Sequence, residues 1–80
     1  MRIVKEIKHP DCKITVFSWN DKYLIKFEKG LLEQTYKVNE WDILEEKDLN
    51  DLIEGKLINN VINRFDDMIN DLNEAMLKIQ

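Results

Sequence analysis

Three short turn sequences divide the first 38 residues into four strand-like runs. Asn20-Asp21 and Lys29-Gly30 resemble the two-residue turns that join antiparallel strands, and a four-residue turn begins at His9. These turns predict three facing pairs: Lys8 with Lys13, Trp19 with Lys22, and Glu28 with Leu31. No connection is long enough for a crossover, so the runs predict an antiparallel meander with strands at Arg2–Lys8, Lys13–Trp19, Lys22–Lys29 and Leu31–Val38.

The three registers agree on one buried face of the sheet. Side chains alternate between the two faces of a strand, so a slip by one residue in any hairpin would scatter the apolar residues. Propagated along the strands, the turns predict three cross-strand rows on this face: Ile7, Ile14, Phe27 and Leu32; Lys5, Val16, Ile25 and Gln34; and Ile3, Ser18, Tyr23 and Tyr36.

After residue 38 the two-residue period is lost. Residues 39–47 read as a connector, and three of its apolar side chains are expected to close one end of the core: Trp41, Ile43 and Leu44. Asp48 is a good N-cap residue, so we expect a short helix over 48–54, which Gly55 breaks or bends.

A long helix is predicted over 56–79, because apolar residues recur there at alternating spacings of three and four. They form a wide stripe: Ile58, Val61, Phe65, Met68, Leu72, Ala75 and Ile79, flanked by Ile62, Ile69 and Met76. Such a helix is ~36 Å long, whereas a seven-residue strand spans only ~23 Å. The helix should therefore overhang the sheet, and its end near Leu72, Met76 and Ile79 is a candidate contact surface.

These elements predict a single α+β domain over residues 1–80. A four-stranded antiparallel sheet (1–38) is followed by a connector (39–47), a short helix (48–54) and a long C-terminal helix (56–79) that packs on one sheet face.

The second face of this sheet is predicted to have an apolar centre inside a charged rim. The registers give its rows as Val4, Phe17, Leu24 and Thr35; Arg2, Trp19, Lys22 and Lys37; and Glu6, Thr15, Lys26 and Glu33. Apolar patches of this kind are typical of protein interfaces. We therefore expect an interface with Val4, Phe17, Trp19 and Leu24 as anchors and Arg2, Lys22 and Lys37 on the rim. Alternatively, the connector covers this face, or the exposure is simply tolerated.

Charge and cysteine content restrict the class of protein. Residues 1–40 carry a net charge of +2 and residues 41–80 a net charge of −6, so the helical half should repel nucleic acid. One cysteine cannot form an internal disulfide, and there is no run of signal-peptide or membrane-spanning length. We expect a cytoplasmic protein without a membrane segment.

Two other functions compete with the interface. Single-stranded nucleic acid could stack on the second face, with Arg2, Trp19, Lys22 and Lys37 as the platform, although only one aromatic residue lies among these basic ones. His9 and Cys12 could share a metal or act as a Cys–His pair, although zinc needs three or four protein ligands. The chain holds no known phosphate-binding or catalytic motif, so we expect a non-catalytic protein with no cofactor, and the sequence identifies no small-molecule substrate.

Several segments resemble a group of small bacterial proteins without an assigned activity. The resemblance lies in His9–Asn20, Lys22–Glu28, Leu32–Lys37 and Arg64–Met68. It implies a bacterial cytoplasmic protein and brings no functional residues with it. The expected function is thus homodimerisation, or docking of a protein partner, on the second sheet face.

Overall fold

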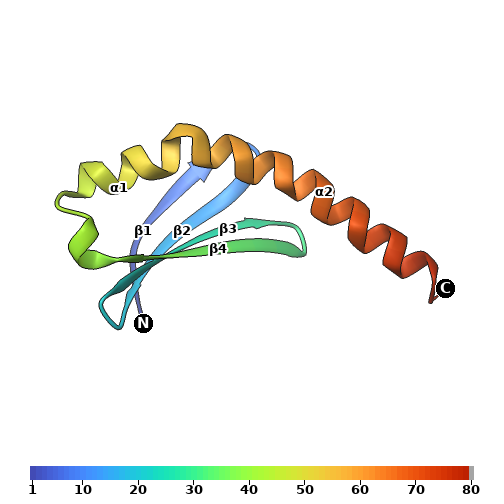
Figure 1. Cartoon of the computed structure of the whole chain (residues 1–80), viewed down its shortest axis with the longest axis horizontal. Coiled ribbons are helices and arrows are strands. Elements are labelled where there is room, and N and C mark those ends of the chain that lie inside the picture. The colour runs from blue at the N-terminus through green and yellow to red at the C-terminus, as the bar shows by residue number, and fades with distance from the viewer. Residues whose placement is uncertain (80) are drawn as a thin grey trace.

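The fold is α+β, as predicted, with four antiparallel strands in one open sheet followed by helices (Figure 1). The computed structural model describes residues 1–79. The strands lie side by side in chain order: β1 (Arg2–His9), β2 (Cys12–Trp19), β3 (Lys22–Lys29) and β4 (Leu32–Asn39). Two-residue turns join them, so each strand pairs with the next one along the chain.

The helical half lies across one face of this sheet (Figure 1). A short 3-10 helix, η1 (Glu40–Asp42), leads to α1 (Glu46–Leu52), a wide π turn, η2 (Ile53–Leu57), and the long α2 (Ile58–Leu77). Glu45 and Asp48 form a reciprocal capping box at the start of α1, which therefore begins two residues before the predicted helix. Among residues 1–79, no helix has the length and apolar character needed to cross a membrane.

The register of the last hairpin differs from the prediction by two residues. Gly30 has φ +60°, and it is the first residue of a Gly30-Leu31 turn, where a type II′ turn places glycine. Lys29 therefore pairs with Leu32, and Glu28 faces Glu33 instead of Leu31. A shift of two leaves every side chain on its predicted face and changes only its neighbours.

A bulge in β1 is the second departure from the predicted registers. Lys8 pairs with Lys13 as expected, but the register changes between Ile3 and Lys5, so that Ile3 faces Phe17. The extra residue is Val4, which packs against the core on the helix side. The predictions that Ile3 lies on the buried face and Val4 on the second face are therefore wrong.

The core lies between the helices and the covered sheet face. Its side chains come from alternate positions of β2 and β3 and from one side of α1, η2 and α2: Cys12, Ile14, Val16, Ile25, Phe27, Leu49, Ile53, Ile58, Val61 and Phe65. With the corrected register, Phe27 faces Gln34 and Ile25 faces Tyr36 across β3 and β4. Phe27 and Tyr36 also meet edge to face, with ring centroids 6.2 Å apart.

Polar contacts fix α2 over β4. The Gln34 side chain donates to the Val61 carbonyl at 2.9 Å, and Arg64 donates to the Tyr36 hydroxyl at 2.9 Å and to the Gln34 side-chain oxygen at 3.3 Å. On the β1 side, the Lys5 ammonium lies 3.3 Å from a Glu46 carboxylate oxygen and also donates to Asn50. These contacts explain how Lys5 and Gln34 sit in rows that are otherwise apolar.

The connector contributes less to the core than expected. Ile43 packs against the core, but Trp41 is 69% exposed and Leu44 is 86% exposed. Trp41 belongs to η1, which holds no buried residue. The prediction that all three residues close one end of the core therefore holds only for Ile43.

Candidate interaction surfaces

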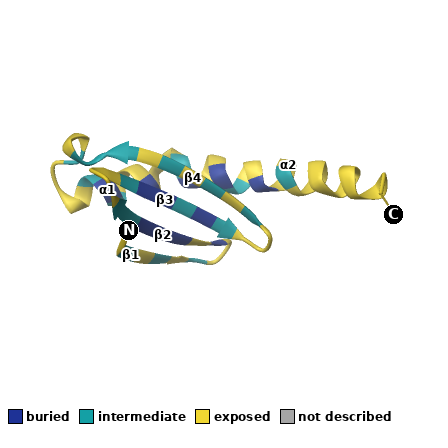
Figure 2. Cartoon of the chain, turned by 90° about the horizontal axis from the view of Figure 1, so that it is seen from below, coloured by how far each residue is buried: buried dark blue, intermediate teal, exposed yellow. Residues whose placement is uncertain are grey.

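The sheet face turned away from the helices, called the outer face below, is directly visible in Figure 2, where the strands lie in front of α1 and α2. Its rows follow from the observed pairings, since directly opposite residues share a face. The central row is Ile3, Phe17, Leu24 and Lys37, flanked by Trp19, Lys22 and Asn39 on one side and by Glu6, Thr15, Lys26 and Thr35 on the other.

Five of the seven predicted interface residues lie on the outer face. Phe17 faces Leu24, which faces Lys37, and Trp19 faces Lys22 in the next row; these five are brought together as one surface. Arg2 and Val4 are not part of it: Val4 packs against the core, and Arg2 faces Ser18, a position of the helix-covered side. Both errors have one cause, the bulge at Val4, which reverses the side-chain alternation of residues 2 and 3.

Ile3 takes the place that was predicted for Val4. It is 57% exposed and lies directly across from Phe17. The sequence carries only one signal for this exchange: Ile3 and Val4 are adjacent apolar residues, and either of them can pack against the core. Adjacent residues of a strand point to opposite faces. The bulge places Val4 on the side of the core and Ile3 on the outer face.

Exposure varies sharply across this apolar centre. Trp19 is 51% exposed, Phe17 is half-buried, and Leu24 is only 7% exposed although it lies outside the core cluster. Leu24 is therefore the floor of the surface rather than a protruding anchor. A shallow hollow of about 210 Å³ lies at this floor and is lined by Met1, Phe17, Leu24, Lys26, Glu33 and Thr35.

The outer face is basic, in contrast to the acidic chain as a whole. Its registers place five lysines and three glutamates on it: Lys8, Lys13, Lys22, Lys26 and Lys37, with Glu6, Glu28 and Glu33. Lys26 lies 3.2 Å from Glu33 and 4.0 Å from Glu28, so part of the negative charge is already paired within the sheet. Lys26 and Glu33, predicted to lie in one row, form this ion pair diagonally and are not directly opposite each other.

The end of α2 forms a second surface, called the overhang below and defined as residues 66–79. It projects past the β3–β4 turn (Figure 1), and it is exposed at every position except Met68 (Figure 2). Phe65 is the last buried residue of the helix. The overhang explains why the molecule extends over 48 Å in one direction but only 24 Å and 19 Å in the others.

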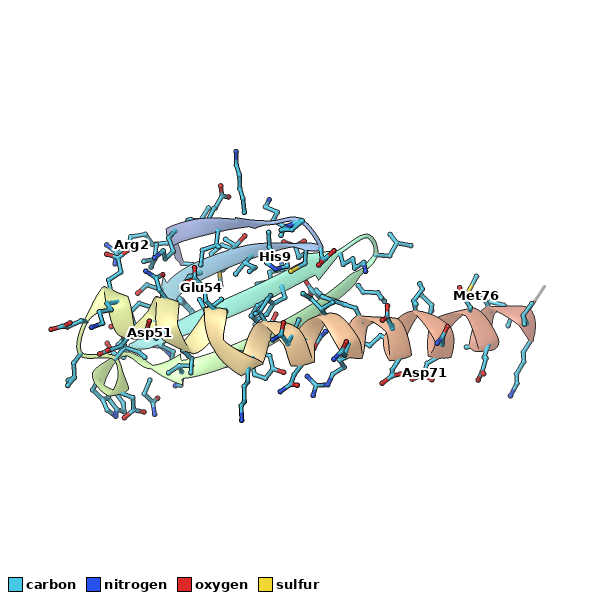
Figure 3. The ribbon with its side chains drawn as sticks, turned by 90° about the horizontal axis from the view of Figure 1, so that it is seen from above. Arg2, His9, Asp51, Glu54, Asp71 and Met76 are labelled. Atoms are coloured by element: carbon cyan, nitrogen blue, oxygen red, sulfur yellow. The ribbon has the colours of Figure 1, made fainter. Side chains whose placement is uncertain are left out.

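The overhang presents an apolar stripe on one side of the helix and most of its acidic residues on the other. The stripe continues the core-facing side of α2 as Ile69, Leu72, Met76 and Ile79, all at least partly exposed. The charged residues of the overhang are Asp66, Asp67, Asp71, Glu74 and Lys78. In Figure 3, Asp71 and Met76 lie on opposite sides of the helix, so the acidic side and the apolar stripe of the overhang are separate.

His9 and Cys12 face each other across the first turn, but their surroundings do not resemble a reactive site. Burial, and then the charge of Asp11, raise the pKa of the Cys12 thiol, which favours the unreactive neutral form. His9 Nδ1 accepts a hydrogen bond of 3.1 Å from the Asp11 backbone N–H. A hollow of about 520 Å³ adjoins both residues, lined only by this hairpin: Glu6, Ile7, Lys8, His9, Cys12 and Lys13.

Metal ligation would need further donors. Within residues 1–79, no three His, Cys, Asp or Glu side chains lie close enough together to hold an ion. This includes the carboxylates of Asp67, Asp71 and Glu74 on α2, which are exposed. The described part of the chain thus gives no geometric support to the metal hypothesis at His9 and Cys12.

Neither catalytic geometry nor similarity to known proteins defines a function for this chain. The two surfaces above are the features that the fold leaves open for contacts, and the resemblance to small bacterial proteins stays a prediction. No family model, curated protein or solved structure matches the chain.

Proposed function

We propose that this chain is a small non-catalytic binding module that acts through the outer face, by self-association or by docking a protein partner. The observation that carries the proposal is the coincidence of three features on one face. Both helices pack on the opposite side (Figure 1), Trp19 and Ile3 are half-exposed or more, and lysines surround this apolar centre.

The composition of this face fits an interface better than a wet sheet surface. An antiparallel sheet with one solvated face normally carries polar residues there. Here the centre holds Ile3, Phe17 and Trp19 around the buried Leu24. A half-exposed tryptophan next to an apolar centre and inside a charged rim is the composition in which binding energy is typically concentrated.

The size of the chain also supports association. A domain of 80 residues has one small core, which supplies only ~3–5 kcal/mol of net stability. Covering the apolar centre of the outer face would add buried area that the single chain does not have. Binding that occurs only in the folded state stabilises that state by mass action.

The test compares two apolar-to-acidic substitutions at exposed sites. Trp19→Glu places a charge in the outer face, whereas Leu44→Glu changes an exposed apolar residue of the connector. We expect Trp19→Glu to weaken self-association, measured by sedimentation equilibrium, by about tenfold or more, because truncating an aromatic anchor typically costs 2 kcal/mol or more. Leu44→Glu should leave the dissociation constant unchanged.

Tryptophan fluorescence gives an independent measurement. Trp41→Phe removes the other tryptophan, so Trp19 alone reports on the outer face. The emission of Trp19 should shift to shorter wavelength as the protein is concentrated, since its ring leaves water. For a heterologous partner, capture on an affinity column should be lost with Trp19→Glu and kept with Leu44→Glu. A monomer with constant Trp19 emission and no Trp19-dependent partner would refute the proposal.

A further inference from the structure

We propose that the free edge of β4 is a separate binding site, which takes up an extended segment of a partner protein as a fifth, antiparallel strand. The segment carries an acidic side chain on its helix-facing side, where Arg64 binds it. This site lies outside the outer face, so the inference goes beyond the proposed function and does not depend on it.

The backbone of β4 presents three of its residues to this edge. The two-residue turn after β3 is closed by the hydrogen-bonded pair of Lys29 and Leu32, and hydrogen-bonded pairs alternate along an antiparallel ladder. The N–H and C=O groups of Glu33, Thr35 and Lys37 therefore point away from β3. Within residues 1–79, no turn, loop or cap forms a backbone hydrogen bond with them. A row of unpaired backbone groups is a template for another extended chain.

The two edges of the sheet differ in how well they are protected. In β1 the bulge at Val4 interrupts the ladder, and a bulge is a common device that makes an edge unsuitable for pairing. β4 has eight residues in one regular register and contains neither a bulge nor a proline. The regular edge is thus the one that can hold an added strand along its length.

The long helix leaves the sheet on the side of this edge. On its way to the C-terminus, α2 crosses over β4 and lies outside β4 at the level of the β3–β4 turn (Figure 2). Hydrogen bonds between Gln34 and Val61 and between Arg64 and Tyr36 fix the crossing. A fifth strand would extend the sheet by ~5 Å and would therefore lie beneath the part of α2 past the crossing. The helix would cover one face of the added strand there.

Arg64 places a positive charge beside this position. Its guanidinium reaches the Gln34 and Tyr36 side chains, so it lies on the flank of α2 nearer the free edge. The opposite flank, with Asp66 and Ile69, lines the hollow at the β3–β4 turn. Both bonds of Arg64 use Nη1, which leaves the donors of Nη2 and Nε for a carboxylate. Among residues 1–79, Arg64 is exposed and forms no ion pair.

The register of β4 specifies the segment further. In an antiparallel strand centred on Thr35, the residue opposite Tyr36 points to the helix side, so a carboxylate there meets Arg64. On the other side, Glu33 favours a basic partner and Lys37 an acidic one. The segment therefore reads acidic, acidic, threonine, any residue, basic. The sequence of β4 over residues 33–37 has this order once its glutamine is replaced by glutamate.

A separate segment is favoured over a second copy of the whole chain, although the second copy contains a similar sequence. Gln34 and Arg64 hold α2 over β4, so a second copy paired at this edge would bring its own α2 over the neighbouring strand. Neighbouring strands lie ~5 Å apart, whereas packed helices need ~8–10 Å between their axes. A segment without an attached helix avoids this clash.

Two synthetic peptides test the acidic preference by fluorescence anisotropy with the whole chain. The first copies residues 31–39 with both ends blocked, and the second has glutamate at the position of Gln34. We expect the glutamate peptide to bind about tenfold tighter in low salt, because Arg64 donates charge-assisted hydrogen bonds to it. With Arg64→Ala the two peptides should bind equally. An advantage of the glutamate peptide that persists in this variant would overturn the role of Arg64.

A substitution at one backbone amide tests the strand pairing itself. Thr35→Pro removes an N–H group that points away from β3, so the ladder between β3 and β4 is kept, and Thr35→Val is the control that retains the group. We expect Thr35→Pro to weaken peptide binding by about tenfold or more and Thr35→Val to leave it unchanged. Circular dichroism checks that both variants are folded.

Methylation of the peptide backbone gives the same test without changing the protein. A methyl group on the amide that pairs with Thr35 should abolish binding, whereas one on the adjacent amide, which points away from β4, should have little effect. This measurement decides the question even if Thr35→Pro does not fold. Equal effects of the two methyl groups would show that the peptide does not bind as a strand.

The outcomes separate this inference from the proposed function. Trp19→Glu should bind both peptides as wild type does; if it abolishes their binding, the peptides lie on the outer face and the inference alone fails. No binding of either peptide up to about 1 mM would refute the edge site. Self-association of the whole chain that Thr35→Pro removes would show that a second copy occupies the edge, and would overturn the choice of a separate segment.

Discussion

Individual backbone positions decide the registers of this sheet, and the two turns with positive φ show how. Asn20 and Asp21 have φ of 56° and 64°, which fits a type I′ turn, and this hairpin has the predicted register. In the last hairpin, glycine can occupy either central position of a two-residue turn. The sequence alone did not distinguish Lys29-Gly30 from Gly30-Leu31, so the predicted register was wrong by two.

Asp21 is the less favourable residue of its turn, because Asn-Gly suits a type I′ turn better than Asn-Asp. We expect Asp21→Gly to raise the free energy of unfolding by about 0.5–1 kcal/mol, since glycine carries no side-chain penalty at positive φ. The Glu40 amide donates to the Asp21 carbonyl at 3.0 Å, and this backbone contact is retained. Urea denaturation measures the change. Asp21→Ala is the control and should be destabilising; a stabilising effect there would contradict this explanation.

Cys12 gives a pH prediction at the same scale. Burial and the nearby Asp11 charge raise the pKa of the thiol in the folded chain above the ordinary value of 9.0. The unfolded chain therefore loses this proton first as pH rises, so stability is intact below pH 9.0 and falls as the pH approaches the folded pKa. Between pH 8 and 10, wild type should lose more stability than Cys12→Ala in parallel urea titrations. Equal losses would show that the thiol does not contribute.

At the scale of the elements, the sequence predicted the faces well and the continuity of the helices less well. Ile58, Val61 and Phe65 follow at helical spacing and were predicted as part of the apolar stripe, whereas the prediction did not include Leu49 and Ile53, which are four residues apart and belong to the same core. The step from Ile53 to Ile58 is five residues, one more than a regular helix uses. The π turn at Gly55, with its non-helical backbone, absorbs that extra residue and keeps both stripes on the sheet.

Deletion of single residues tests this interpretation. Removing Gly55 shortens the step from Ile53 to Ile58 from five residues to four, so one regular helix can present both stripes to the sheet. We expect this variant to unfold cooperatively with a thermal midpoint within about 5 °C of wild type, since loss of the helix penalty of glycine offsets local rearrangement. Removing the exposed Asn60 instead should rotate Val61 and Phe65 out of the core and cost about 3 kcal/mol or more. Calorimetry compares the two variants. Equal losses of stability would contradict the explanation that the turn at Gly55 keeps both apolar stripes on the sheet.

The same scale explains which parts of the candidate site could be predicted. The hairpin of β2 and β3 has the predicted register, so alternation alone placed four of its residues on the outer face: Phe17, Trp19, Lys22 and Leu24. Val4 is the bulged residue and Arg2 lies beyond it, so alternation fails at both positions. The burial of Leu24 was also outside the reach of periodicity, because it depends on how neighbouring side chains lie on the face rather than on which face they occupy.

The molecule as a whole combines a small core with two surfaces that a single chain leaves open. Ten buried residues form the core cluster, while the overhang accounts for much of the 48 Å long axis. A helix segment that contacts nothing receives little stability from its own short length. The part of α2 beyond Phe65, its last buried residue, therefore gains little stability from packing within its own chain.

Self-association through the outer face, as proposed above, would affect thermal stability. If two chains cover each other's outer faces, folding and association are linked, and the midpoint of unfolding rises with protein concentration. Raising the concentration to about a hundred times the dissociation constant adds about 2.7 kcal/mol, or about 10–20 °C for a domain of this size. Differential scanning fluorimetry over two decades of concentration should show this rise for wild type and for Leu44→Glu. Trp19→Glu, whose association is weaker by about tenfold or more, should show a smaller rise that begins at correspondingly higher concentrations. A rise equal to that of wild type in this variant would place the association somewhere other than the outer face.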